Sequence, residues 1–109
     1  MANKFYIYSM ALGDTDIIKV GYTNDLNRRK GEHGRKYGCP KQVKVIDSIA
    51  LNSKATAEKV EQILLQAMKD AGFEMVRDSQ NGNTERFYAR PDMTEVTITI
   101  RKPRTLKVG

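Results

Sequence analysis

The amphipathic helix predicted in the middle of the chain is the sequence feature that most constrains the fold. From about Ser53 to Ala71, apolar residues recur at spacings of three and four, and Gly72 then ends the pattern. The members of this stripe are Ala57, Val60, Ile63, Leu64, Ala67, Met68 and Ala71. A helix of this kind buries one face and leaves the other in water, so the pattern predicts one long helix packed on the rest of a small domain.

Strand-like segments lie on both sides of this helix in the sequence. The first two, Phe5–Met10 and Ile17–Tyr22, are rich in aromatic and β-branched residues and flank a turn at 13–16, which predicts a hairpin. The remaining strand candidates are Val43–Leu51, a short segment at Glu85–Ala89, and Thr94–Arg101. In the last of these, apolar and polar residues alternate, as in a strand with one buried face.

A shorter helix is predicted between the second and third strands, from about residue 25 to 36, with capping residues at 23–25. The predicted fold class is therefore α/β (α+β). Its small central sheet is expected to be mostly antiparallel and three-stranded, flanked by helices and extended by a C-terminal strand. Residues 1–109 are expected to form a single domain, in which about 102–109 make a basic, flexible tail.

Size and composition exclude several classes of protein. The chain has 109 residues, of which 39% are apolar, enough for one modest core. No apolar run approaches the roughly 18 to 20 residues of a membrane span, and residues 1–5 lack the apolar stretch of a secretory signal. We therefore expect a cytoplasmic protein without a membrane partner. With one cysteine, Cys39, and one histidine, the chain can form neither an intrachain disulfide nor a Cys/His zinc site.

The positive charge of the chain is concentrated in two segments. The net charge is +6, while residues 24–44 alone carry +5 and residues 101–109 carry +4, so the remainder is slightly acidic. Such a distribution is typical of a face that binds a polyanion, nucleic acid above all. The nucleic-acid-binding candidates are Arg28, Lys30, Arg35, Lys36 and Lys41. A basic surface without a nucleic-acid partner is the alternative at this point.

Residues capable of chemistry occur in a defined order along the predicted strands and helices. Tyr-Ile-Tyr at 6–8 lies in the first strand, and Lys-Val-Gly at 19–21 lies in the second. Arg29 and His33 are four residues apart and share one face of the first helix, and Glu61 lies in the long helix. This order and spacing resembles the GIY-YIG nuclease superfamily, and most closely its small phage and bacterial branch, whose second motif reads Lys-Ile-Gly.

The resemblance, which spans roughly residues 4 to 90, implies a metal-dependent endonuclease that hydrolyses phosphodiester bonds with one divalent ion, Mg²⁺ or Mn²⁺. It implies that Tyr8 acts as or relays the general base, that Arg29 contacts the scissile phosphate, and that Glu61 holds the metal. The other catalytic candidates are Lys19, His33 and Tyr6. The expected partner is nucleic acid, DNA more than RNA, in a bacterium or a phage-infected cell. A homodimer or a targeting partner is left open.

The position of Glu61 on its helix agrees with that role. At 100° per residue, Glu61 falls at about 100° from Val60, on the margin of the apolar stripe, where a side chain can reach a groove beside the sheet. Glu58 falls at about 160° and is expected to face solvent. Of the two carboxylates, only Glu61 is predicted to be a ligand.

Structural interpretations are also open for several of these residues. Tyr6 and Tyr8 are two apart and share a face, which fits a common groove or a common core. Gly21 fits a close backbone approach or a strand kink. His33 lies in a glycine-rich polar stretch and is expected to be exposed, where it would serve as a phosphate contact, an auxiliary acid or base, or a structural residue.

The sequence departs from the family pattern in its first and second motifs. Tyr6 stands where the family has its name-giving glycine, and Lys19 stands where it has tyrosine, although some members carry lysine there. The asparagine expected near the end of the family's core has no secure match, with Asn81 and Asn83 as candidates. The alternative function is a catalytically inactive nucleic-acid-binding or interaction protein on the same scaffold, such as a phage accessory factor.

Overall fold

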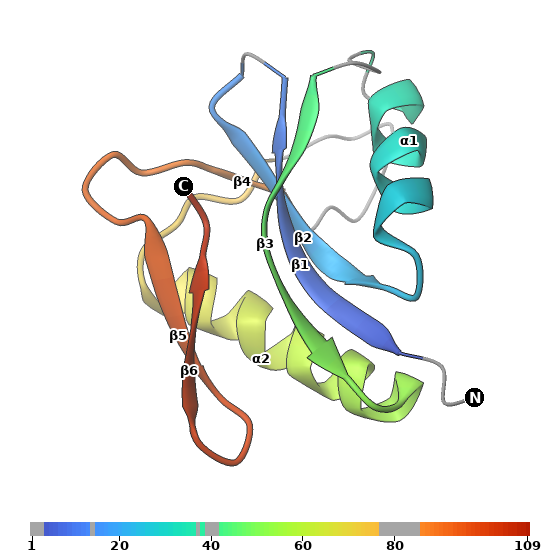
Figure 1. Ribbon diagram of the computed structural model, residues 1–109. Coiled ribbons are helices and arrows are strands. Elements are labelled where there is room, and N and C mark those ends of the chain that lie inside the picture. The colour runs from blue at the N-terminus through green and yellow to red at the C-terminus, as the bar shows by residue number, and fades with distance from the viewer. Residues whose placement is uncertain (1–3, 14, 37, 39–41, 77–85) are drawn as a thin grey trace.

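The computed structural model describes residues 4–13, 15–36, 38, 42–76 and 86–109 of the chain. The elements follow one another as β1 (Phe5–Leu12), β2 (Ile17–Thr23), α1 (Leu26–Lys36), β3 (Val43–Leu51), α2 (Lys54–Asp70), β4 (Arg86–Tyr88), β5 (Glu95–Thr99) and β6 (Pro103–Lys107). Among the described residues the fold is α+β, as predicted, with two helices, an antiparallel four-stranded sheet and a two-stranded C-terminal hairpin (Figure 1).

The strands of the main sheet lie in the order β3-β1-β2-β4, and each neighbouring pair is antiparallel. β1 and β2 form the predicted hairpin, in which Tyr8 lies opposite Gly21. β4 is short: it pairs with Ile17–Lys19 at the start of β2, and Phe87 also forms an isolated bridge with Met75. The sheet therefore has a fourth strand beyond the three predicted, because the short segment Arg86–Tyr88 joins its edge.

The alternating side chains of β1 divide the core between the two faces of the sheet. Ile7 packs with the apolar stripe of α2, whose most buried members include Val60 and Leu64. Tyr8 and Met10 point to the opposite face, in a smaller cluster next to α1. The two helices therefore cover opposite faces of the sheet (Figure 1).

Both helices begin where the sequence predicts. Ser53 caps α2 by accepting a hydrogen bond from the backbone N–H of Thr56 at 3.1 Å, and Asp25 accepts one from the backbone N–H of Arg28 at 3.0 Å. Gly72 follows α2 with a φ of 90°, a left-handed conformation that glycine adopts without strain. Neither helix in the described part of the chain is long and apolar enough to cross a membrane.

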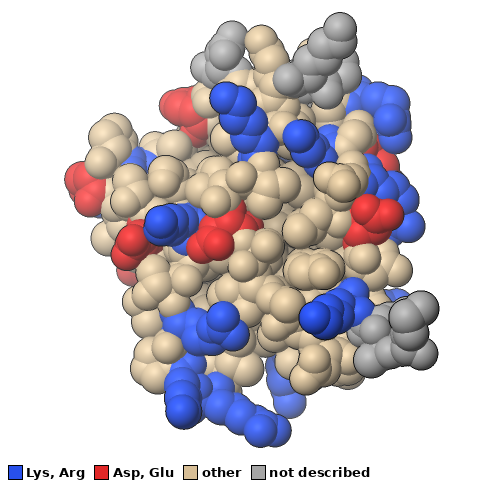
Figure 2. All heavy atoms as spheres, in the orientation of Figure 1, with Lys and Arg blue, Asp and Glu red and all other residues tan. Residues whose placement is uncertain are grey.

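The C-terminal segment is structured, which corrects the expectation of a flexible tail over about 102–109. Pro103–Lys107 forms β6 and pairs with β5, so the single C-terminal strand of the prediction is one half of a hairpin. The net charge of the segment suggested a tail, whereas Leu106 and Val108, two residues apart, both lie buried on one face. The backbone N–H of Val108 also donates to the carbonyl of Thr94 at 2.8 Å. Figure 2 shows Lys and Arg side chains gathered at the lower end of this view, where the hairpin turn lies in Figure 1.

Candidate active site

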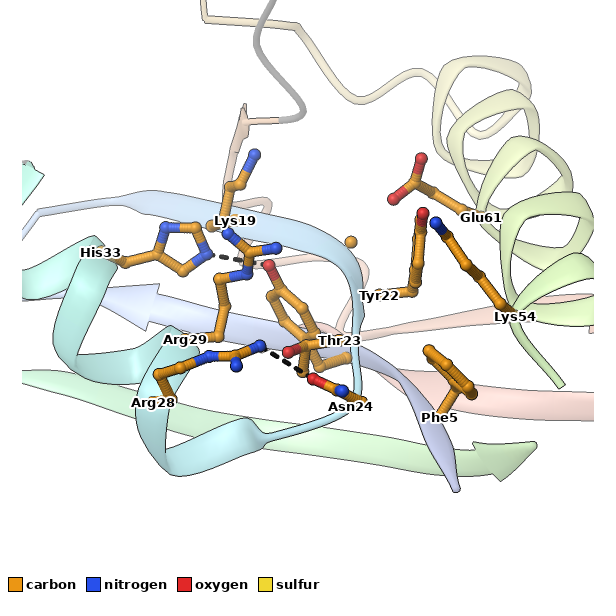
Figure 3. Close-up of a pocket in the computed structure, with 12 residues that line it drawn as sticks. Phe5, Lys19, Tyr22, Thr23, Asn24, Arg28, Arg29, His33, Lys54 and Glu61 are labelled. Carbon is orange, nitrogen blue, oxygen red and sulfur yellow. Dashed lines mark hydrogen bonds between the residues drawn. The ribbon is translucent and has the colours of Figure 1, made fainter. Parts of the chain in front are cut away.

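A pocket of about 540 Å³ lies around the second half of β2, between α1 and α2 (Figure 3). Within β2, the described residues of β4 pair with the start of the strand, Ile17–Lys19, and the pocket lies beside the part that follows, Val20–Thr23. The lining residues are Phe5, Tyr8, Lys19, Gly21, Tyr22, Thr23, Asn24, Arg28, Arg29, His33, Lys54 and Glu61.

The pocket brings together most of the residues predicted to carry chemistry. These residues, from two strands and two helices, are Tyr8, Lys19, Arg29, His33 and Glu61. Figure 3 shows Arg29 and His33 on one side of β2, and Glu61 with Lys54 on the other. Side chains far apart in the sequence therefore border one cavity.

Tyr8 and His33 form a hydrogen-bonded pair inside the site. The Tyr8 hydroxyl lies 2.8 Å from His33 Nε2. Tyr8 is 2% exposed and His33 is 5% exposed, so both polar groups are largely withdrawn from water. A hydrogen bond between buried groups is costly to lose without a replacement. The contact therefore fixes the phenol oxygen of β1 relative to α1.

The burial of His33 corrects the expectation that this residue is exposed. α1 is a strongly polar helix, and among its residues only His33 and Gly34 are buried. His33 follows Leu26 by two helical turns, so it continues the face that Leu26 packs on the sheet. A helix with so few apolar residues carries little signal for which face is buried, which is why the prediction was wrong.

The surroundings of His33 favour its neutral form. Burial, followed by the positive charges of Lys19, Arg29 and Lys36, lowers the pKa of His33 from 6.5 to about 4. At neutral pH the imidazole is therefore uncharged. One of its two ring nitrogens then has a lone pair that can accept a proton.

Gly21 lies directly against the Tyr8 phenol. A Cβ added at Gly21 would lie 2.8 Å from the Tyr8 hydroxyl oxygen and 3.2 Å from its Cζ. These separations are shorter than van der Waals contact, so the absence of a side chain at Gly21 is what lets the ring take this position. Of the two interpretations of Gly21, the close approach is therefore the correct one.

Two arginines at the start of α1 line the same pocket. Arg28 donates to Asn24 Oδ1 at 2.8 Å, and its Nε lies 3.6 Å from Glu32. Arg29 Nη1 lies 3.9 Å from Glu32, and the buried Nε of Arg29 has no hydrogen-bond partner in the described part of the chain. An unsatisfied buried donor is costly, and a bound anion would satisfy it.

Among the described residues that line the pocket, Glu61 is the one with a carboxylate. It is 9% exposed, whereas Glu58 is exposed to solvent, so the helical-wheel placement of both residues is confirmed. The described residues contain no group of three His, Cys, Asp or Glu side chains that could hold a metal ion. A divalent ion in this pocket would take one protein carboxylate and complete its shell from water and substrate phosphate, as Mg²⁺ readily does.

Besides Gly21, five lining residues are not among the predicted site residues: Phe5, Tyr22, Thr23, Asn24 and Lys54. The sequence signal that could have identified four of them is their position next to predicted site residues. Residues 22–24 follow Gly21 directly, and Lys54 precedes Glu61 by two helical turns. The Tyr22 hydroxyl donates to Glu58 at 3.1 Å. Burial and the Glu58 carboxylate raise the pKa of Tyr22, so this second phenol stays protonated at neutral pH.

Tyr6 is a predicted catalytic residue that the structure does not bring to the pocket. It is partly exposed and is not a lining residue, although it shares the strand face of Tyr8. The two candidates for the family's asparagine, Asn81 and Asn83, lie outside the described residues.

Four of the five predicted nucleic-acid-binding residues lie along α1. Arg28 lines the pocket, whereas Lys30, Arg35 and Lys36 are exposed on the helix without lining it. Lys41 lies outside the described residues. Of these predicted contacts, Arg28 is therefore the one that the described structure places at the pocket.

A family model supports the sequence resemblance at the level of the domain. The model of the T5orf172 domain matches residues 4–102. This range includes every residue that lines the pocket and ends just before β6. No curated protein and no solved structure matches the chain significantly.

Proposed function

The chain belongs to the T5orf172 domain family, a nuclease-related family of GIY-YIG type, and we propose that it is a metal-dependent endonuclease that hydrolyses phosphodiester bonds in DNA. The observation that carries the proposal is the buried hydrogen bond between Tyr8 and neutral His33. Arg29 lies on the same side of the pocket as His33, and Glu61 faces them from the other side (Figure 3). Phosphodiester hydrolysis needs a base, a cation at the phosphate and a carboxylate for a metal ion.

Tyr8 and His33 together provide a route for the proton of the attacking water. In the tautomer protonated at Nδ1, His33 Nε2 accepts the phenol proton across the 2.8 Å hydrogen bond. The phenol oxygen takes a proton from water as its own proton moves to the imidazole. Tyr8 thereby acts as the base that touches water, and His33 stores the proton.

The low pKa of His33 makes this transfer depend on the substrate. Lys19 and Arg29 disfavour a further positive charge on the imidazole. A scissile phosphate bound beside these cations would add negative charge and raise the proton affinity of His33. The base would therefore gain strength when the substrate is in place.

Arg29 and Lys19 would stabilise the charge that develops on the phosphate. Arg29 offers a planar set of donors, among them the Nε that has no partner among the described residues. Lys19 is 8% exposed, so its ammonium group acts where water screens charge less than in bulk solvent.

Glu61 is the residue that would hold the divalent ion, Mg²⁺ or Mn²⁺. Its carboxylate is a hard oxygen ligand at the edge of a polar pocket, so the residues present fit such an ion. When bound, the ion would stabilise negative charge on the phosphate and on the leaving 3′ oxygen. Glu61 and His33 lie on opposite sides of the pocket in Figure 3, so the metal ligand and the proposed base would act from different sides of a bound phosphate.

Cleavage of a supercoiled plasmid tests the proposal. The purified chain should nick the plasmid with Mg²⁺ or Mn²⁺, and EDTA should stop the reaction. Arg29→Ala should lose turnover by orders of magnitude and much less of its DNA affinity, because the other cations of α1 are kept. Equal losses of binding and turnover would make Arg29 an ordinary phosphate contact.

The alternative, an inactive nucleic-acid-binding protein on this scaffold, predicts a different outcome of the same experiment. Such a protein would retard the plasmid in a gel but would not nick it with either metal. Binding without cleavage would therefore overturn the proposed activity. The buried Tyr8–His33 pair argues for the enzyme, since a surface that only binds phosphate has no need of it.

A further inference from the structure

The turn of the β5–β6 hairpin carries a cluster of cations that the proposed chemistry does not use. Arg101, Lys102 and Arg104 are all exposed, and none of them lines the pocket. The sequence has no acidic residue after Glu95, so no carboxylate of the hairpin turn neutralises them. In Figure 2, the Lys and Arg side chains at the lower end of the view have no Asp or Glu beside them. The cluster is therefore a local source of positive potential.

The outward face of the hairpin is polar, with threonines in its middle and the pair Glu95–Lys107 at the end away from the turn. Thr97 lies opposite Thr105 in the ladder, and both are exposed, as is Thr99. Threonine hydroxyls, together with Arg and Lys, are common donors to the phosphate oxygens of nucleic acids. No large apolar side chain interrupts this face, which argues against a protein partner that would bury an apolar core.

The hairpin is held in place by its inner face and by the main sheet. Val96, Ile98 and Leu106 are buried in the core that includes α2. At the far end of β6, the backbone N–H of Lys107 donates to Asp47 Oδ2 at 2.9 Å, and its carbonyl accepts from the Ser9 hydroxyl. The exposed cations therefore stand on a fixed support, which lowers the conformational cost of binding.

We propose that the β5–β6 hairpin is a second contact with the phosphate backbone of duplex DNA, separate from the pocket. The proposal rests on the proposed function, because it takes DNA as the substrate. Duplex DNA presents phosphates at close, regular spacing, which suits several cations and hydroxyls fixed on one support. The contact would raise affinity for DNA without taking part in the chemical step.

The first test measures DNA binding in a chain that cannot cleave, the Glu61→Gln variant. The triple substitution Arg101→Gln, Lys102→Gln and Arg104→Gln should raise the Kd for a 20-base-pair duplex by about 10-fold or more. It should also lower the slope of log K against log salt by about 2 to 3, since each of the three cations would neutralise one phosphate. Fluorescence anisotropy at several salt concentrations measures both quantities.

The matched control removes the same number of charges elsewhere. Lys4, Lys59 and Lys69 are exposed, do not line the pocket and lie outside the two basic segments of the chain. Their triple replacement by Gln should change the Kd by less than about 3-fold, because distant charges are screened within a Debye length. Equal effects of the two triple variants would overturn the hairpin contact. Equal losses on single-stranded DNA or on duplex RNA would overturn the assignment to duplex DNA.

The second test uses the cleavage reaction of the chain with Glu61 intact. The hairpin variant should raise KM for plasmid cleavage and leave kcat unchanged, and its unfolding midpoint should match that of wild type. A fall in kcat would overturn the separation of the hairpin from the chemistry. If no variant cleaves but the selective weakening of binding is present, the hairpin contact holds and the nuclease proposal fails, so the two failures are distinguishable.

Discussion

At the scale of single residues, the Tyr8 side chain is fixed by neighbours from two different elements. His33 of α1 holds its hydroxyl by a hydrogen bond, and Gly21 of β2 leaves room for its ring. The phenol oxygen therefore has one defined position in the pocket. Substitutions at each of these three residues should have distinct consequences.

Tyr8→Phe should lower turnover by about 10²-fold or more, because it removes the oxygen that takes the proton of water. Stability should fall by about 1 to 3 kcal/mol, since His33 loses a buried partner. DNA affinity should hardly change. Single-turnover cleavage, urea unfolding and anisotropy measure the three effects. Tyr6→Phe, outside the pocket, is the control, and full activity in Tyr8→Phe would move the base role to Lys19 or His33.

Gly21→Ala should reduce turnover by about 10²-fold, because the added methyl group displaces the phenol from its position. In the Tyr8→Phe background, where the crowded oxygen is gone, the same change should cost little more. Gly31→Ala is the control, since its Cβ would meet only the end of Arg35, at 3.5 Å. That change should stabilise α1 by about 0.5 to 1 kcal/mol. Similar losses at both glycines would contradict the close-contact explanation.

His33 should make stability fall as the pH drops below about 6.5. Its pKa is about 4 in the folded chain against 6.5 in the unfolded chain, so between these values only the unfolded state binds the proton. The loss begins near pH 6.5 and is complete near pH 4. His33 is the single histidine of the chain, so the interval above about pH 5 reports on it alone. Urea midpoints should fall in wild type and stay flat in His33→Gln, and a flat wild-type curve would show that the imidazole is not held neutral.

At the scale of elements, β1, β2 and both helices meet at the pocket, and the C-terminal hairpin completes the core. In the described part of the chain, β4 pairs with Ile17–Lys19 at the start of β2, and the pocket lies beside the second half of β2, where it is lined by side chains from both helices. β5 and β6 contribute Val96, Ile98 and Leu106 to the same core as α2. The hairpin is therefore a structural part of the fold.

Leu106→Ala should destabilise the chain by about 2 to 5 kcal/mol, because the side chain is fully buried and its removal leaves a cavity. Thr105→Ala, one residue earlier on the exposed face, should change stability by no more than about 0.5 kcal/mol. Urea unfolding at constant pH measures both. Equal, small effects would mean that the C-terminal segment behaves as the flexible tail expected from its charge.

At the scale of the whole molecule, the candidate site combines residues from the two helices, which cover opposite faces of the sheet. Tyr8, Arg29 and His33 come from the side covered by α1, and Glu61 comes from α2. Because the two groups of residues come from different elements, a substitution in one group should leave the structure of the other group intact. The proposed base and the proposed metal ligand can therefore be removed independently.

Glu61→Gln should abolish metal-dependent cleavage while the unfolding midpoint without metal changes little, because the shape of the side chain is kept and only its charge is lost. Mn²⁺ should raise the unfolding temperature of wild type but not of this variant. The pH dependence of stability from His33 should be the same in both. Glu58→Gln, on the exposed face, should keep its activity. Cleavage by Glu61→Gln at the wild-type rate would exclude Glu61 as the ligand.

The sequence by itself determined the elements whose burial repeats with a regular period. The stripe from Ala57 to Ala71 and the alternation around Val96 reveal α2 and β5, because one buried face requires apolar residues at a spacing of 3.6 or 2 residues. The same periodicity placed Glu61 at the pocket and Glu58 in solvent. The order of the motifs then led to the hypothesis that Tyr8, Lys19 and Arg29 belong to one catalytic site.

Only the tertiary structure decided which of these side chains touch one another. The burial of His33, the contact of Tyr8 with Gly21 and the absence of Tyr6 from the pocket depend on how α1 packs on the sheet. α1 is so polar that its own sequence does not mark the buried face. Likewise, Leu106 is buried because β6 pairs with β5 and packs near α2. Such contacts join residues far apart in the chain, and local periodicity carries no information about them.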